Sequence, residues 1–163
     1  MNNQGKAHKY GDNINTDLVI AGKYTKTLNF QDLADHCLED LDADFVKKVN
    51  KGDLLVVGSN FGCGSSREQA PLALKYAGVS AVLAKSFARI FYRNAINVGL
   101  PVVVCDTSAI NAGDTVELDL DAGTVTVNGS TVIPCQKLPP IMQSILSEGG
   151  LDCFLKKRGD FIL

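Results

Sequence analysis

The amino-acid sequence predicts an α/β fold in which a central parallel β-α-β-α-β unit carries a small antiparallel β meander. Three short apolar runs, at residues 54–58, 81–84 and 101–104, lack polar alternation, which is typical of strands covered on both faces. Helical periodicity fills the two intervals between them, and helices of roughly 10–12 residues suit right-handed parallel crossovers. Beyond Asp106, polar and apolar residues partly alternate, and this pattern favours antiparallel strands.

The two crossover helices each show one apolar stripe, followed by a glycine where the helix should end. The stripes consist of Ala70, Ala73, Leu74 and Ala77 in the first helix, and of Phe87, Ile90, Phe91, Ala95 and Val98 in the second. Gly78 and Gly99 follow the two stripes. Each glycine suits the left-handed position that closes a helix.

The flanking segments complete what we expect to be one domain over residues 1–163. Turn signals at Asp121-Ala122-Gly123 and Asn128-Gly129 divide the meander into strands. Residues 29–41 and 42–52 have helical patterns, whereas residues 11–27 are rich in turn formers and should be mainly loop. Two more short helices are expected within residues 138–157, with Gly149-Gly150 between them.

Composition and charge exclude several classes of function. The formal net charge is −2, and Lys156, Lys157 and Arg158 form the only tight basic run, so no nucleic-acid partner is expected. No apolar run approaches the ~20 residues needed to cross a bilayer, and the N-terminus lacks the apolar stretch of a secretory signal. We therefore expect a cytoplasmic protein without a membrane partner. The cysteines are scattered without a C-x-x-C pair, so no metal site is expected in this chain.

Residues 58–78, GSNFGCGSSREQAPLALKYAG, raise the question of a phosphate or thiol site. A P-loop requires a lysine directly after its second glycine, but Cys63 stands at that glycine position and no lysine follows. A dinucleotide fingerprint begins correctly with Gly62 and Gly64 but ends on Arg67, whose side chain would obstruct helix packing. A thiol nucleophile at Cys63 would need a base, and both histidines are distant in sequence. The pattern therefore favours neither nucleotide binding nor thiol catalysis.

Two interpretations of the adjacent serines remain open. Ser65 and Glu68 have the spacing of a capping box, as do Ser66 and Gln69, so the serines could simply cap the following helix. Capping does not explain Arg67, because a cation in the first turn of a helix opposes the helix dipole. A guanidinium beside bare backbone N–H groups can instead grip a carboxylate through two parallel hydrogen bonds. Helix capping and a small-anion site are both compatible with these residues.

Three motifs together resemble the aconitase superfamily and, within it, the small subunits of 3-isopropylmalate dehydratase. They are Asn15-Thr16-Asp17, the FGCGSSREQAPLALKYAG loop at residues 61–78 and the segment SFARIFYRNAINVGLPV at residues 86–102. The resemblance covers nearly the whole chain. It implies a three-layer β/β/α swivelling domain of the aconitase type, made as a separate chain. It also implies a large partner subunit that holds a 4Fe–4S cluster, without which this chain would be inactive.

The resemblance further implies a hydro-lyase that isomerises 2-isopropylmalate to 3-isopropylmalate by dehydration and rehydration, a step of leucine biosynthesis. Ser65 matches the family's base, which acts as an alkoxide, and Asp17 matches an active-site aspartate. Ser66 and Arg67 match groups that bind a substrate carboxylate. Serine is a very weak acid, so its anion would need the helix N-terminus and neighbouring donors. On the residues alone, Asp17 could instead belong to an Asx-type turn.

The segment AGKYTKTLN, residues 21–29, matches the loop that selects the malate substituent in this family. Homoaconitases typically carry an arginine there for a third carboxylate, and isopropylmalate enzymes carry apolar residues. Tyr24 and Lys26 depart from both patterns. Lys26 could bind a third carboxylate as a point charge, or turn to solvent and leave Tyr24 facing a small alkyl group. Homoaconitase and 2,3-dimethylmalate dehydratase are therefore alternative activities, and a non-catalytic carboxylate-binding module is the alternative from another class.

Overall fold

The computed structural model describes residues 2–158, which form one seven-stranded mixed sheet with helices packed on it. The strands are β1 (Asn2–Lys9), β2 (Leu54–Val56), β3 (Ala81–Ala84), β4 (Val102–Val104), β5 (Thr115–Asp119), β6 (Thr124–Val127) and β7 (Thr131–Pro134). The helices are α1 (Thr16–Val19), α2 (Phe30–Asp35), α3 (Phe45–Lys48), α4 (Gln69–Ala77), α5 (Arg89–Val98), α6 (Pro140–Ser147) and α7 (Leu151–Arg158), with a 3-10 turn η1 at Gly22–Tyr24. The strand order is β4-β3-β2-β1-β5-β6-β7.

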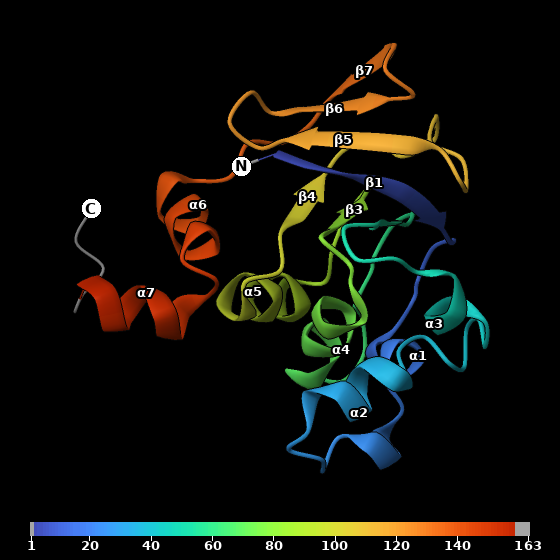
Figure 1. Ribbon diagram of the computed structural model, residues 1–163, viewed down its shortest axis with the longest axis vertical. Helices are drawn as coiled ribbons and strands as arrows, with labels where there is room; N and C mark the ends of the chain where they lie inside the picture. The colour runs from blue at the N-terminus through green and yellow to red at the C-terminus, as the bar shows by residue number, and fades with distance from the viewer. Residues whose placement is uncertain (1, 159–163) are drawn as a thin grey trace.

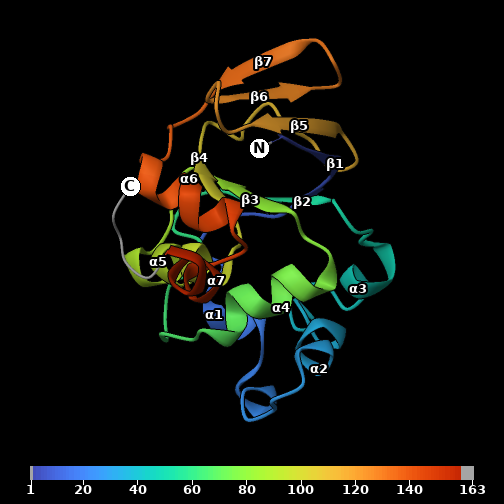
Figure 2. The same ribbon diagram turned by 60° about the vertical axis from the view of Figure 1, so that its left-hand side comes forward.

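The two halves of the sheet share β1 and lie in separate layers. Strands β1 to β4 are parallel, and β5 to β7 continue the sheet antiparallel. Figure 1 shows the antiparallel half above the parallel half, with α4 and α5 on the other side of the parallel strands, and Figure 2 shows the same layers from another direction. This arrangement confirms the predicted α/β fold with a parallel unit and an antiparallel meander.

The outer edges of the sheet meet at one end, next to the last residues of β4 and β7. Cys105 and Cys135 form an antiparallel bridge there. The N–H of Gln136 donates to the carbonyl of Val104 at 2.9 Å. The sheet is therefore partly closed on itself, and the apolar side chains between its two halves form a continuous core with those under α4 and α5.

The parallel unit forms as the apolar runs predict. α4 ends at Gly78 with φ of 113°, and α5 ends at Gly99 with φ of 86°, so both glycines take the left-handed conformation expected of them. Most of the α4 stripe is buried. The predicted apolar stripe of α5 was wrong at Ile90, which is 50% exposed. The helix is rotated so that a neighbouring part of its surface packs on the core. The side chains that α5 buries are Phe91, Ala95 and Ile96.

Sequence reasoning missed β1, the strand at the centre of the sheet. Its residues, NNQGKAHK, are mostly polar, and only Ala7 is buried. Its backbone pairs with β2 on one side and β5 on the other, so pairing on both edges holds the strand without apolar patterning. The helices expected at residues 29–41 and 42–52 are shorter than expected, because turns follow α2 and precede α3. No helix within residues 2–158 is long and apolar enough to cross a membrane.

Candidate functional site

Hydrogen bonds bring the Asn-Thr-Asp motif against residues 62–67, which we call the serine loop. The N–H of Thr16 donates to the carbonyl of Cys63 at 2.9 Å, and the hydroxyl of Thr16 donates to the carbonyl of Ser65 at 2.8 Å. Asn15 caps α1, since its side chain accepts a hydrogen bond from the N–H of Leu18. The first turn of α1 therefore lies beside the serine loop.

The third motif supplies an apolar floor for the serine loop. Phe61 forms a bridge with Phe87, and its ring meets the Phe91 ring edge-on with centroids 5.0 Å apart. Gly62 adopts φ of 82°, and a Cβ at this position would lie 2.3 Å from Cγ of Phe91. Only glycine fits here, because a side chain would clash with the ring and strain the backbone.

Arg67 is the charged centre of the site. Its Nη2 lies 2.7 Å from Oδ1 of Asp17, and its Nη1 donates to the carbonyl of Ile20 at 3.1 Å. The Arg67 side chain is 23% exposed, and that of Asp17 is 59% exposed. The sequence predicted an arginine that grips a carboxylate. In the isolated chain, the carboxylate in contact with Arg67 is that of Asp17.

The serines do not cap α4, so the capping-box interpretation was wrong. The helix begins at Gln69, its N-cap is Glu68, and no side chain accepts a hydrogen bond there. The hydrogen bond from the Thr16 hydroxyl holds the Ser65 carbonyl outside the helix. Arg67 accordingly precedes α4 instead of occupying its first turn.

Both serine side chains point into accessible space. Ser65 and Ser66 are exposed, and neither hydroxyl takes part in a hydrogen bond within the described part of the chain. The serine loop thus leaves two hydroxyl groups free beside the Arg67–Asp17 pair.

The loop formed by residues 21–29 lies against the same arginine. A Cβ at Gly22 would be 3.3 Å from Nη2 of Arg67, so the loop backbone borders the guanidinium closely. The side-chain amide of Gln69, at the start of α4, donates to the carbonyl of Thr25 at 3.2 Å. The serine loop, α1 and the 21–29 loop therefore meet around Arg67.

The two loop residues singled out in the sequence have different surroundings. The Tyr24 ring stacks on the His36 ring, with centroids 3.8 Å apart and planes within 5°. Lys26 is exposed and has no ion pair within the described part of the chain. From the sequence, the histidines were considered only as possible bases for Cys63. No spacing signal could have linked His36 to Tyr24, because a turn and α2 separate them.

A thiol or metal centre has no support among the described residues. His8 Nε2 lies 2.8 Å from Oδ2 of Asp53, and His36 Nδ1 lies 3.4 Å from Oε1 of Glu39, so each imidazole is engaged with a carboxylate. Burial raises the pKa of Cys105 to about 12. Within residues 2–158, no three His, Cys, Asp or Glu side chains gather closely enough to hold a metal ion.

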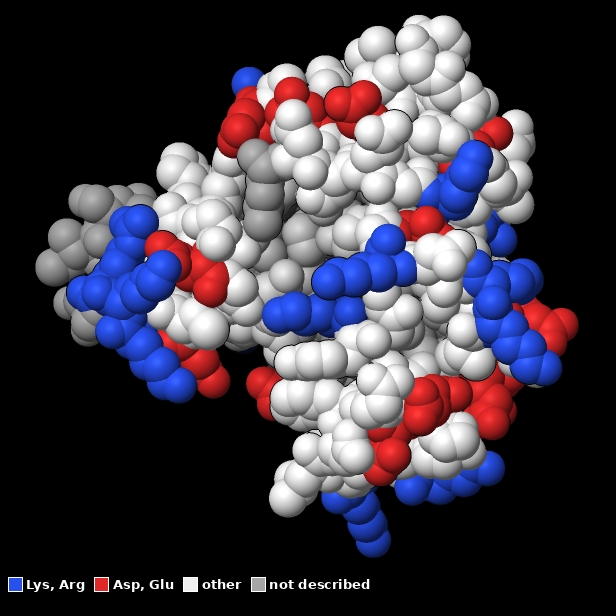
Figure 3. Space-filling model, viewed as in Figure 1, with Lys and Arg blue, Asp and Glu red and all other residues white. Residues whose placement is uncertain are grey.

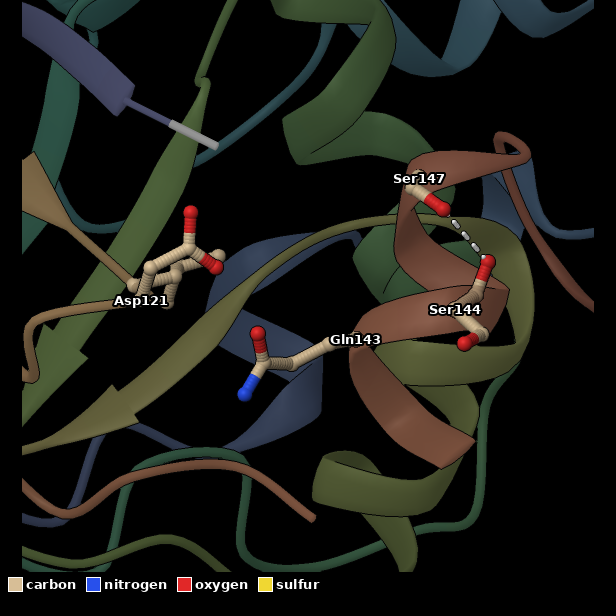
Figure 4. Close-up of a pocket in the computed structure, with 5 residues that line it drawn as sticks. Asp121, Gln143, Ser144 and Ser147 are labelled. Atoms are coloured by element: carbon tan, nitrogen blue, oxygen red, sulfur yellow. Dashed lines mark hydrogen bonds between the residues drawn. The ribbon is translucent and has the colours of Figure 1, made fainter. Parts of the chain in front are cut away.

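A separate hollow of about 250 Å³ lies between the β5–β6 turn and α6 (Figure 4). The amide of Gln143 donates to the carbonyl of Leu138 at 2.9 Å, and the hydroxyl of Ser147 donates to the carbonyl of Ser144 at 2.8 Å. These polar groups thus already bond the backbone of α6 and the segment before it. None of the motif residues lines this hollow.

Comparisons with known proteins agree on one family. The family described as aconitase C-terminal domain matches residues 3–106. A 3-isopropylmalate dehydratase small subunit from Caldicellulosiruptor bescii is 56% identical over 94% of each chain. The methanogen homoaconitase small subunit of Methanocaldococcus jannaschii is 51% identical over 95% of this chain and 92% of its own. The 2,3-dimethylmalate dehydratase small subunit of Eubacterium barkeri is 50% identical over 93% and 94%.

A solved structure agrees with these relatives. The crystal structure of a 3-isopropylmalate dehydratase from Methanocaldococcus jannaschii superposes with a TM-score of 0.94 and 51% identity. The match covers 98% of this chain and 96% of the other. The chain belongs to the aconitase C-terminal domain family, among the small subunits of 3-isopropylmalate dehydratase and its near relatives.

Proposed function

We propose that this chain is the small subunit of a cytoplasmic hydro-lyase that isomerises 2-isopropylmalate to 3-isopropylmalate in leucine biosynthesis. A large iron–sulfur subunit would complete the enzyme, and the small chain alone would be inactive. The observation that carries the proposal is the contact between Arg67 and Asp17 beside the exposed Ser65 and Ser66. The high identity with named small subunits supports the same reaction class.

Arg67 is proposed to bind a substrate carboxylate together with Ser66. A guanidinium has more N–H donors than its contacts with Asp17 and Ile20 use, so donors remain for a ligand. The contact with the Ile20 carbonyl also fixes the plane of the guanidinium group, which lets a carboxylate approach its N–H donors in a defined direction. The exposed Ser66 hydroxyl adds a donor on the neighbouring residue.

Ser65 is proposed to remove the proton from the carbon next to the substrate carboxylate. Asp17 is proposed as a second catalytic residue beside Ser65. Asp17 neutralises and orients Arg67 through Oδ1, while more than half of its side chain stays accessible. The open serine loop would be enclosed only when the large subunit covers it, and exclusion of water strengthens the electrostatic support that an alkoxide needs. A 4Fe–4S cluster in the large subunit would supply the Lewis acid for the departing hydroxide.

Lys26 supports a second candidate within the same reaction class. Its ammonium group is exposed, without an ion pair in the described residues, and it lies two positions beyond Tyr24 in the loop that borders Arg67. Such a cation can receive the third carboxylate of homocitrate, which would make the chain homoaconitase-like. With Lys26 turned to solvent, Tyr24 and the threonine methyl groups would face an isopropyl or methyl substituent.

The test is an anaerobic assay of this chain reconstituted with its large subunit. Turnover of 2-isopropylmalate, homocitrate and 2,3-dimethylmalate is compared for the natural chain, Ser65→Ala and Lys26→Ala. We expect isopropylmalate to be the best substrate and Ser65→Ala to abolish turnover. Loss of homocitrate turnover alone in Lys26→Ala would assign the third carboxylate to this lysine. If Ser65→Ala weakens binding but the natural chain catalyses nothing, the chain is a carboxylate-binding module instead.

A further inference from the structure

The 21–29 loop has little burial in the core, against which its Tyr24 ring packs while partly exposed. None of its residues is buried, and Leu28, near its end, is 95% exposed. Apolar burial is the main force that fixes a segment on a protein, so a loop with so little of it depends largely on individual contacts. Two of them hold its backbone next to the site, namely Arg67 against Gly22 and Gln69 on the Thr25 carbonyl.

A third contact holds a side chain of the loop. The Tyr24 ring lies parallel to the His36 ring at 3.8 Å, and Nζ of Lys23 lies 5.1 Å from the centroid of the Tyr24 ring. The nearby Tyr24 hydroxyl lowers the pKa of the Glu39 carboxyl. Glu39 also faces Nδ1 of His36. Tyr24, His36 and Glu39 thus form a three-residue clamp.

The base of this clamp is rigid, unlike the loop that it holds. His36 and Glu39 flank Cys37 and Leu38, which are both fully buried. The N–H of Leu38 donates to the carbonyl of Val19 at 2.8 Å, which ties the turn after α2 to the end of α1. Figure 3 shows acidic side chains gathered on the surface around α2. These carboxylates attract the ammonium group of Lys23, which lies over the Tyr24 ring.

We propose that His36 and Glu39 are positioning residues, which set the shape of the 21–29 loop and thereby the substituent that the site accepts. The inference rests on the proposed function, because it assumes that this loop borders the substrate. Tyr24 then acts as the anchor of the loop, since one face of its ring is stacked on His36. Lys26 lies two positions beyond this anchor, so a shift of Tyr24 moves the lysine relative to Arg67.

The proposal is tested with His36→Ala and His36→Phe in the reconstituted enzyme. The phenylalanine keeps a ring for Tyr24 to stack on, whereas alanine removes it. The measured quantity is the ratio of kcat/KM for 2-isopropylmalate to that for 2,3-dimethylmalate, which does not depend on the fraction of folded protein. We expect His36→Ala to change this ratio about fivefold, mainly through KM, and His36→Phe to change it less than about twofold.

Glu39→Gln and Asp40→Asn form a matched pair of charge removals on neighbouring exposed residues, of which only Glu39 belongs to the clamp. We expect a change in the ratio for Glu39→Gln and none for Asp40→Asn. An unchanged ratio in His36→Ala, with normal turnover by the natural chain, would overturn the proposal. An equal change of the ratio in Asp40→Asn would also overturn the proposal, because the loss of any nearby surface charge would then explain the effect.

Hydrogen exchange of the small chain alone separates this proposal from the proposed function. Amide exchange in residues 21–29 should be about fivefold faster in His36→Ala and close to the natural rate in His36→Phe. If the natural enzyme turns over none of the substrates but exchange rises in His36→Ala, the proposed function fails and the clamp stands. If exchange is unchanged in His36→Ala, the clamp fails whatever the activity.

Discussion

Replacement of Arg67 by lysine probes the centre of the site while keeping its charge. In the structure the guanidinium uses two nitrogens at once, Nη2 with Asp17 and Nη1 with the Ile20 carbonyl. A lysine has a single ammonium group without a planar fork, so it cannot keep both contacts and also receive a substrate carboxylate through two parallel bonds. We expect the ammonium group to stay with Asp17 and to bind the substrate less well.

The magnitude follows from the loss of one hydrogen bond between charged groups. Such a bond contributes about 1.5–3 kcal/mol, which corresponds to a fall in kcat/KM of about ten- to a hundredfold. The loss should lie mainly in KM, because the substrate carboxylate is bound in both the ground state and the transition state. A smaller loss of kcat is expected if the substrate also becomes misaligned over Ser65.

The assay is steady-state turnover of Arg67→Lys with saturating large subunit. Arg158→Lys serves as the matched control, since Arg158 lies on α7, with its guanidinium carbon 5.3 Å from the centroid of the Phe154 ring, and the same change there should leave KM unaltered. An unchanged KM in Arg67→Lys would refute the assignment of Arg67 to the substrate carboxylate. A fall in kcat alone would place Arg67 in the chemistry rather than in binding.

Three further predictions concern the scaffold of the site. Gly62→Ala should lower the free energy of unfolding by about 2–4 kcal/mol in urea denaturation, because its Cβ would meet the Phe91 ring at positive φ; a loss below about 1 kcal/mol would contradict this. Asn15→Ala should cost about 1 kcal/mol through the lost cap of α1, and equal urea midpoints for variant and natural chain would count against it. Burial opposes ionisation of Asp53, but hydrogen bonds from His8 and two backbone N–H groups lower the pKa of this carboxyl. The ionised carboxylate therefore stabilises the fold fully above about pH 5, and this stabilisation is lost as the pH falls through the lowered pKa. The acid-induced loss of stability should be smaller in Asp53→Asn, and equal pH dependence of the two chains would rule out this role.

The central α/β unit was predictable from the sequence because its signals are local. Continuous apolar runs and a closing glycine each depend on a few neighbouring residues, and Gly78 and Gly99 took the conformation expected of them. β1 could not be predicted in this way, since its stability comes from partners on both edges. The exposed Ile90 shows the same limit. An apolar stripe predicts that a segment is helical more reliably than it predicts which face of the helix packs on the core.

Within the candidate site, the residue types were predictable but their partners were not. The pairing of Arg67 with Asp17 joins the serine loop to α1, which only the completed sheet brings together. The capping box failed for a similar reason, since the hydroxyl of Thr16, a residue far upstream, holds Ser65 out of the helix. The substrate roles of Ser65, Ser66 and Lys26, and the organisation of the chain as one domain, stay predictions.

The contact between the two edges of the sheet has a consequence for the chain before its partner arrives. An open edge presents unpaired N–H and C=O groups that can recruit strands of other molecules and start aggregation. Beside β4 and β7, part of this backbone is already used by the Cys105–Cys135 bridge and by the hydrogen bond from Gln136 to Val104. Partial closure of the sheet thus gives the unassembled subunit some protection against aggregation.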